Sequence, residues 1–157
     1  MHFACYQSMN MIPSNSTYAE TGKKRVLIVD DEQDLTWSIV RRLSKDRKSL
    51  EFFCTDSGDQ ALDFMHRKQV DLLVTDLRMP GMSGQELIRK ARSRLPELKI
   101  IIMTAFHSPE LREFGRDFQV TATLEKPFDI NDLRNLIYIN CLGENRIDEG
   151  RFDHGKS

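Results

Sequence analysis

The chain has 157 residues, which is enough for one domain with a substantial hydrophobic core. Its 23 Lys and Arg residues nearly balance its 24 Asp and Glu residues, so overall charge does not favour binding to nucleic acid or to anionic membranes. No apolar run approaches the ~20 residues of a membrane-spanning helix, and the N-terminal stretch lacks the basic start and apolar core of a signal peptide.

The composition of the two chain ends and the spacing of the cysteines give two further predictions. Residues 1–22 are rich in Ser, Asn, Thr and Met without a period, which predicts a flexible extension, and residues 143–157 predict a polar tail. Cys5, Cys54 and Cys141 are odd in number and far apart, so they predict neither a metal site nor a disulfide framework. Reduced thiols of this kind are typical of a cytoplasmic protein.

The first predicted element is a strand at residues 26–29, "VLIV", which ends in Asp30 and Asp31. A helix follows, because Leu35, Ile39 and Leu43 recur every fourth residue. The next strand is predicted at residues 50–54. After it, "SGDQ" at residues 57–60 fits a capping box, in which a Ser hydroxyl caps the first amide groups of a helix.

The same alternation continues along the chain. A strand at residues 71–75 ends in Asp76, and "SGQE" at residues 83–86 predicts another capped helix. A strand at 99–103 ends in Thr104, and the segment 107–118 is the weakest predicted helix because Gly115 lowers its stability. A last strand at 120–124 leads to Lys126-Pro127 and to a helix that Asp129 can cap.

Strand and helix patterns alternate five times between residues 23 and 142, which predicts a single α/β domain. Such an order favours a parallel sheet with helices on both faces, joined by right-handed crossovers. The expected architecture is therefore a doubly wound (βα)5 fold.

Carboxylates gather at the carboxyl ends of the predicted strands, where ligands bind in open α/β sheets. Asp30, Asp31 and Asp76 would repel one another there unless a cation joined them, and Mg²⁺ prefers such oxygen ligands. Lys126 and Thr104 end neighbouring strands and suit an incoming phosphoryl group. Each feature alone has an ordinary structural explanation, but together they predict a metal-assisted phosphoryl site.

Four segments together resemble the receiver domain of bacterial two-component response regulators: "VLIVDDE" (26–32), "DLLVTDLRMPGMSGQEL" (71–87), "IIIMTA" (100–105) and "LEKPF" (124–128). The resemblance covers residues 23–142. It implies a flavodoxin-like sheet with strand order 2-1-3-4-5 and a module that catalyses only its own phosphorylation and dephosphorylation, not an enzyme.

The resemblance also implies a role for each site residue. Asp76 would be the phosphoacceptor, and Asp31 and Asp76 would bind Mg²⁺ directly. Asp30 would act on the metal largely through water, and the main-chain carbonyl of Arg78 would complete the protein ligands.

The other implied roles concern the transferred group. Lys126, in a cis Lys–Pro bond, would pair with the phosphoryl oxygens, and Thr104 would move to donate a hydrogen bond to one of them.

The chain departs from the family pattern at three positions on its fourth-helix and fifth-strand side. Thr123 stands where an aromatic residue is usual, and Gln119-Val120 replaces the common Gly-Ala. We hypothesise that the ring of Phe106, two residues after Thr104, takes the part of the missing aromatic residue. The mode of signal output is therefore expected to differ from the usual one.

The implied partners are a sensor histidine kinase or a histidine phosphotransfer protein as donor, and an unknown downstream protein. Direct binding of nucleic acid or membrane is not expected, and homodimerisation on phosphorylation stays open. Three alternatives remain: the receiver part of a longer transcriptional regulator, a phosphorylation-independent pseudo-receiver, and an aspartate-nucleophile phosphatase. The phosphatase is disfavoured because Arg78 stands where such enzymes need a second acid.

Overall fold

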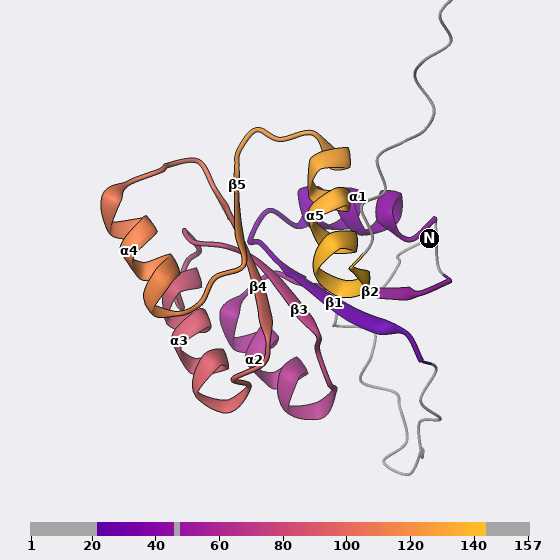
Figure 1. Ribbon diagram of the computed structural model, residues 1–157, viewed down its shortest axis with the longest axis horizontal. Helices are drawn as coiled ribbons and strands as arrows, with labels where there is room; N and C mark the ends of the chain where they lie inside the picture. Colours follow the sequence, from indigo (N-terminus) through magenta and orange to yellow (C-terminus); the bar gives the residue numbers. More distant parts are fainter. Residues whose placement is uncertain (1–21, 46–47, 144–157) are drawn as a thin grey trace, which may run out of the picture.

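The computed structural model describes residues 22–45 and 48–143 as one five-stranded parallel sheet with five helices (Figure 1). The strands lie in the order β2-β1-β3-β4-β5, which confirms the predicted flavodoxin-like topology. Their bounds are β1 (Lys24–Val29), β2 (Leu50–Thr55), β3 (Leu72–Asp76), β4 (Lys99–Thr104) and β5 (Ala122–Glu125). Most of the predicted extension and tail, residues 1–21 and 144–157, lies outside the described residues.

The helices cover both faces of the sheet, as the alternating pattern predicts. They are α1 (Gln33–Leu43), α2 (Gly58–Arg67), α3 (Gly84–Arg94), α4 (Pro109–Asp117) and α5 (Ile130–Leu142). Buried residues of α1 and α5 pack in one core cluster, and those of α2, α3 and α4 pack in a second cluster on the opposite face. No helix in the described part of the chain is both long and apolar enough to cross a membrane.

Side chains at the helix starts confirm the predicted caps. Ser57 and Ser83 accept hydrogen bonds from the amides of Gln60 and Glu86, and Asp129 accepts one from Asn131. The weakly predicted fourth helix also forms, beginning at Pro109 behind a Ser108 cap. Ser108 was missed as a cap because Leu111, not Glu or Gln, stands three residues later.

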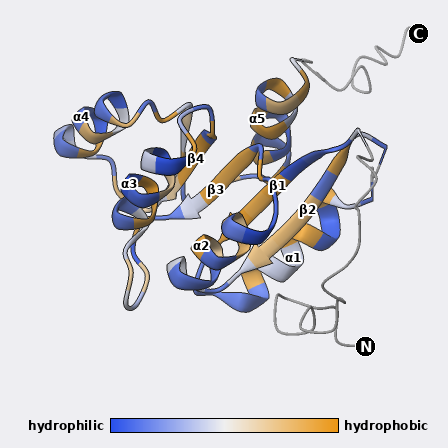
Figure 2. Ribbon diagram, turned by 90° about the horizontal axis from the view of Figure 1, so that it is seen from below, coloured by the Kyte–Doolittle hydropathy of each residue, from blue (hydrophilic) through white to orange (hydrophobic). Residues whose placement is uncertain are grey.

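Burial differs sharply across the sheet. The side chains of Val26 to Val29 on β1 are 0% exposed, as expected for a strand covered on both faces. On the edge strand β5, half-buried Ala122 and Leu124 alternate with exposed Thr123 and Glu125. Figure 2 shows the same pattern, with apolar strands inside and hydrophilic outer faces on the helices. The centre of the sheet is therefore the rigid platform for the strand ends.

The turn between α4 and β5 contains a backbone outlier. Gln119 has a φ of 52°, in the left-handed region that favours glycine. The receiver domains that the sequence resembles usually carry glycine at this position, so the departure noted in the sequence places a strained residue in the native turn.

Candidate functional site

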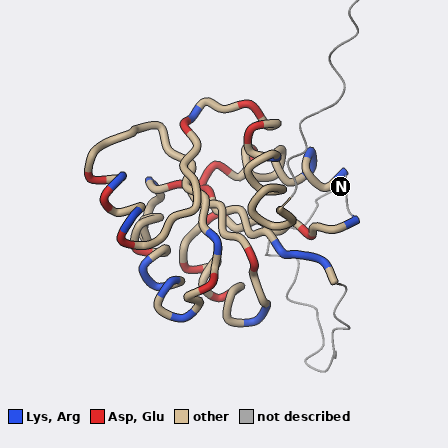
Figure 3. Tube along the Cα trace, viewed as in Figure 1, with Lys and Arg blue, Asp and Glu red and all other residues tan. Residues whose placement is uncertain are grey.

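The three predicted acids meet at the carboxyl edge of the sheet. Parallel pairing sets Val29 of β1 beside Thr75 of β3, which brings the two following acids, Asp30 and Asp76, next to each other. One carboxylate oxygen from each of Asp30, Asp31 and Asp76 lies within 4.8 Å of the other two. Acidic segments gather near this end of the strands, whereas α2 and α3 end in basic turns (Figure 3).

Lys126 lies directly on this acid cluster. Its Nζ atom is 2.6 Å from Oδ2 of Asp30 and 3.5 Å from Oδ2 of Asp76, and Asp30 is fully buried. Burial lowers the pKa of Lys126, but the hydrogen bond and charge of Asp30, followed by the charges of Asp76 and Glu32, outweigh burial and raise it. Lys126 is therefore a firmly protonated cation in a crowded acidic site.

Backbone amides hold the remaining carboxylate oxygens. The amide of Glu32 donates to Oδ1 of Asp30 at 3.0 Å, and the amide of Leu77 donates to Oδ1 of Asp76 at 2.7 Å. These charge-assisted bonds orient both side chains before any ligand arrives.

Gly84 is required by the close approach of α3 to the end of β3. A Cβ atom at Gly84 would overlap the carbonyl oxygen of Asp76 and lie 2.7 Å from Cα of Leu77. In the same contact, the amide of Gly84 donates to the carbonyl of Leu77 at 2.9 Å. The start of α3 therefore fixes the backbone that carries Asp76.

Thr104 ends β4 beside the site but turns its hydroxyl toward its own loop. Its Oγ1 donates to the carbonyl of Phe106 at 3.0 Å and accepts from the amide of Phe106 at 3.1 Å. The backbone amide of Lys126 donates to the carbonyl of Thr104 at 2.7 Å, which joins the ends of β4 and β5. The Lys126-Pro127 bond is cis, as the resemblance implied.

Two site residues implied by the sequence contact each other. The guanidinium of Arg78 lies 4.3 Å from the ring centroid of Phe106, and this ring is 58% exposed. The contact joins the loop after β3 to the loop after β4. Sequence reasoning named both residues separately but missed their contact, which no pattern of spacing reveals.

The residues present fit a hard divalent cation. Three carboxylates converge, and exposed Asp31 leaves one side of the cluster open to solvent. Mg²⁺ typically takes one or two carboxylates and keeps several waters, which this half-open arrangement allows. The predicted ligand role of the Arg78 carbonyl stays a prediction.

Arg92 is a structural residue that sequence reasoning missed. From α3, its guanidinium donates to the carbonyls of Phe118 at 3.1 Å, Gln119 at 3.2 Å and Pro96 at 2.6 Å. Burial lowers the pKa of Arg92, partly offset by Glu97. The side chain therefore clamps the turn before β5, including its strained residue.

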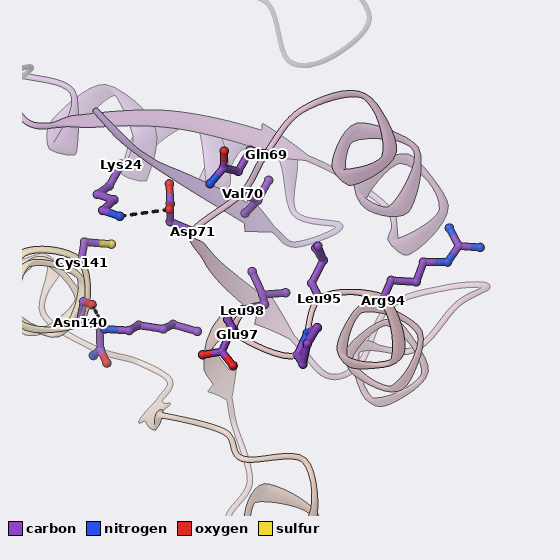
Figure 4. Close-up of a pocket in the computed structure, with 12 residues that line it drawn as sticks. Lys24, Gln69, Val70, Asp71, Arg94, Leu95, Glu97, Leu98, Asn140 and Cys141 are labelled. Atoms are coloured by element: carbon purple, nitrogen blue, oxygen red, sulfur yellow. Dashed lines mark hydrogen bonds and ion pairs between the residues drawn. The ribbon is translucent and has the colours of Figure 1, made fainter. Parts of the chain in front are cut away.

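A pocket lies at the amino ends of β1, β3 and β4, at the opposite ends of these strands from the acid cluster (Figure 4). This pocket measures about 440 Å³ and has mixed charge, with Lys24 3.5 Å from Asp71. Cys141 also lines it, and burial, with Asp71, raises the pKa of this thiol to about 11. Cys141 is therefore a protonated, weakly nucleophilic thiol near neutral pH.

The sequence model of the response regulator receiver domain matches residues 26–138, most of the described chain. The chain belongs to this family. Receiver domains are signalling modules of two-component systems rather than classical enzymes, so the fold and the acid cluster agree with a phosphorylated signalling domain.

The relatives include single receivers and longer regulators. The response regulator receiver protein CpdR of Brucella abortus is 34% identical over 114 residues, which cover 73% of this chain and 93% of that protein. The DNA-binding transcriptional regulator NtrC of Klebsiella pneumoniae is 36% identical over 110 residues, which cover 70% of this chain. The chain spans only 23% of the length of NtrC.

Solved structures support the fold. The chemotaxis protein CheY4 of Vibrio cholerae superimposes with a TM-score of 0.68 at 26% identity, covering 75% of this chain and 98% of that chain. The likeness therefore extends over nearly all of that solved chain.

Proposed function

We propose that the chain accepts a phosphoryl group on Asp76 from a sensor histidine kinase or a histidine phosphotransfer protein. The observation that supports this most is the convergence of three acids with one lysine, 2.6 Å from Asp30 and 3.5 Å from Asp76. An acid cluster alone is common on protein surfaces. A lysine beside acids that can hold a metal ion supports phosphoryl transfer more specifically, because such sites stabilise the charge of the transferred group with metal ions and a lysine.

The proposed reaction uses the carboxylate of Asp76 as the nucleophile. It attacks phosphorus, the bond from phosphorus to the donor nitrogen breaks, and the histidine leaves with its electron pair while an acyl phosphate forms. Lys126 is placed to pair with the phosphoryl oxygens. Thr104 would then donate its hydroxyl proton to one of them.

Mg²⁺ is the proposed cofactor. Asp30, Asp31, Asp76 and the main-chain carbonyl of Arg78 would hold it, and it would supply positive charge that offsets the charge of the phosphoryl oxygens. Because the ion would bind among repelling carboxylates, it would also stabilise the folded state by mass action.

Phosphorylation can be tested with acetyl phosphate and Mg²⁺, followed by intact mass measurement. The wild type is expected to gain one stable phosphoryl group, and Asp76→Asn none. Asp59→Asn, an exposed acid in the first turn of α2, serves as the matched control and should behave as the wild type. Phosphorylation of Asp76→Asn to the wild-type level would overturn the assignment.

The same experiment separates the alternatives. A pseudo-receiver would gain no mass, and a phosphatase would consume the donor repeatedly without holding the group. This chain matches only 23% of the length of NtrC, which supports the further proposal that it is the receiver part of a longer transcriptional regulator.

Two proposals concern the protein as a whole. We place it in the cytoplasm. Gel filtration of the phosphorylated form would show whether it dimerises.

A further inference from the structure

The loops on either side of the acid cluster are joined by an exposed cation on an aromatic ring. The distance of 4.3 Å from Arg78 to the Phe106 centroid is shorter than the 5.2 Å of Arg41 over Trp37 and of Arg89 over Phe114. Arg78 belongs to the loop of Asp76, and Phe106 belongs to the loop of Thr104. The contact therefore connects the two loops whose residues would handle the phosphoryl group.

Thr104 adds two hydrogen bonds to the backbone of Phe106 and so helps to hold the ring in place. Its single hydroxyl proton is donated to the carbonyl of Phe106, and its oxygen accepts the amide of the same residue. A hydroxyl has only one proton to donate. Thr104 cannot bond a phosphoryl oxygen as a donor while it holds the carbonyl of Phe106, so its rotation must release this loop.

A neighbouring side-chain contact joins the same loop to the edge strand β5. Nε2 of His107 lies 3.3 Å from Oε2 of Glu125, the last residue of β5. Release of Phe106 would therefore also disturb the end of β5, the strand that precedes Lys126.

We propose that Arg78, Phe106 and Thr104 form a latch that holds the unphosphorylated conformation closed. The inference rests on the proposed phosphorylation of Asp76. In the closed conformation the guanidinium of Arg78 lies on the ring of Phe106, and the hydroxyl of Thr104 is hydrogen-bonded to the backbone of Phe106. In the open conformation both contacts are lost and the Thr104 hydroxyl faces the acid cluster.

The size of the effect follows from the strength of an exposed cation–π contact. Loss of such a contact shifts a two-state equilibrium by about two- to fivefold. If the open conformation is the minor one and is the one that is phosphorylated, then the phosphorylation rate rises by the same factor.

The test is the initial rate of phosphorylation by acetyl phosphate at saturating Mg²⁺, measured by intact mass. Arg78→Gln and Phe106→Leu should each react about two- to fivefold faster than the wild type, and the double variant no faster than the faster single variant. Phe106→Leu removes the ring without changing charge, so it separates the latch from any electrostatic effect on the anionic donor.

One conservative variant and one control sharpen the test. Phe106→Tyr keeps the ring and should keep the wild-type rate. Arg89→Gln removes a similar exposed cation from the rings of Phe114 and Phe118 and should also leave the rate unchanged. All four single variants change exposed side chains, so thermal unfolding is expected to confirm intact folds.

The failures of the two proposals are distinguishable. A wild type that gains no phosphoryl group overturns the proposed function, and the latch with it. A wild type that is phosphorylated, with Phe106→Leu no faster than it, overturns the latch alone. Independent, multiplicative effects of the two substitutions would also overturn it, because they would show that the side chains do not act as one contact.

Discussion

The β1–β3 centre of the sheet, here called the rigid half, and its β4–β5 side, called the variable half, differ in how firmly they are built. Asp30 follows β1 and Asp76 ends β3, two strands that are buried on both faces, and each acid accepts a hydrogen bond from a backbone amide on one of its oxygens. On the other side, β5 alternates half-buried and exposed residues, a strained Gln119 precedes it, and Thr123 faces solvent. The acid cluster is thus held by the densest part of the fold, while the part expected to report phosphorylation has room to vary.

The largest loss of stability is expected at Gly84, where the rigid half has no space for a side chain. Gly84→Ala should destabilise the fold by about 3 kcal/mol and abolish phosphorylation, because its methyl group overlaps the backbone of Asp76. Chemical unfolding and the acetyl phosphate reaction measure both effects.

Gly115→Ala on α4 is the matched control for this change. Its new Cβ atom would lie 3.8 Å from Cβ of Val120, so it should instead stabilise the protein by about 0.5–1 kcal/mol. Equal tolerance of alanine at both glycines would remove the proposed contrast between the two halves.

A second, smaller effect concerns the charge balance of the rigid half. Lys126→Met leaves fully buried Asp30 without its cation and should cost about 2 kcal/mol in the absence of metal, less than for a fully buried pair because Lys126 keeps some exposure. Mg²⁺ should then raise the melting temperature of this variant more than that of the wild type, since the metal replaces the missing charge.

Lys90→Met provides the comparison, because its ion pair with Glu86 is exposed on both sides. It should change stability by less than about 0.5 kcal/mol and leave the Mg²⁺ response as in the wild type. An equal Mg²⁺ response in the Lys126 and Lys90 variants would mean that Lys126 does not share its acids with the metal.

The smallest effect belongs to the variable half. Gln119→Gly should stabilise the protein by about 0.5–1 kcal/mol, because glycine relieves the left-handed backbone and this gain exceeds its extra entropy in the unfolded chain. Gln69→Gly, at an exposed glutamine outside the positive-φ region, should destabilise it by a similar amount. Thermal unfolding of the two variants side by side would reveal a shift of the same sign if Gln119 is not strained.

The sequence allowed accurate prediction of the rigid half and only part of the variable half. Apolar runs predicted all five strands, and the acids at the strand ends predicted the acid cluster, because parallel strands bring their carboxyl ends to one edge. The helix caps at Ser57 and Ser83 were equally predictable, since each hydroxyl and the amide that it caps lie within one helical turn.

Contacts between different loops could not be predicted from sequence patterns. The Arg78–Phe106 contact and the Arg92 clamp depend on long flexible side chains that reach partners on other elements. The bonds of Thr104 to Phe106 were also missed, because the resemblance describes where the hydroxyl goes on phosphorylation and not where it is held beforehand. Side-chain direction is set by packing that a single sequence does not display.

The separation of the site residues along the chain has a consequence for synthesis on the ribosome. Asp30 and Asp31 emerge first, Asp76 joins them only when β3 pairs with β1, and Lys126 follows β5 much later. A nascent chain that has completed β3 therefore carries three converging acids without their lysine. During that interval the repulsion among the acids opposes β1–β3 pairing, so free Mg²⁺ should favour early docking of the first half of the sheet.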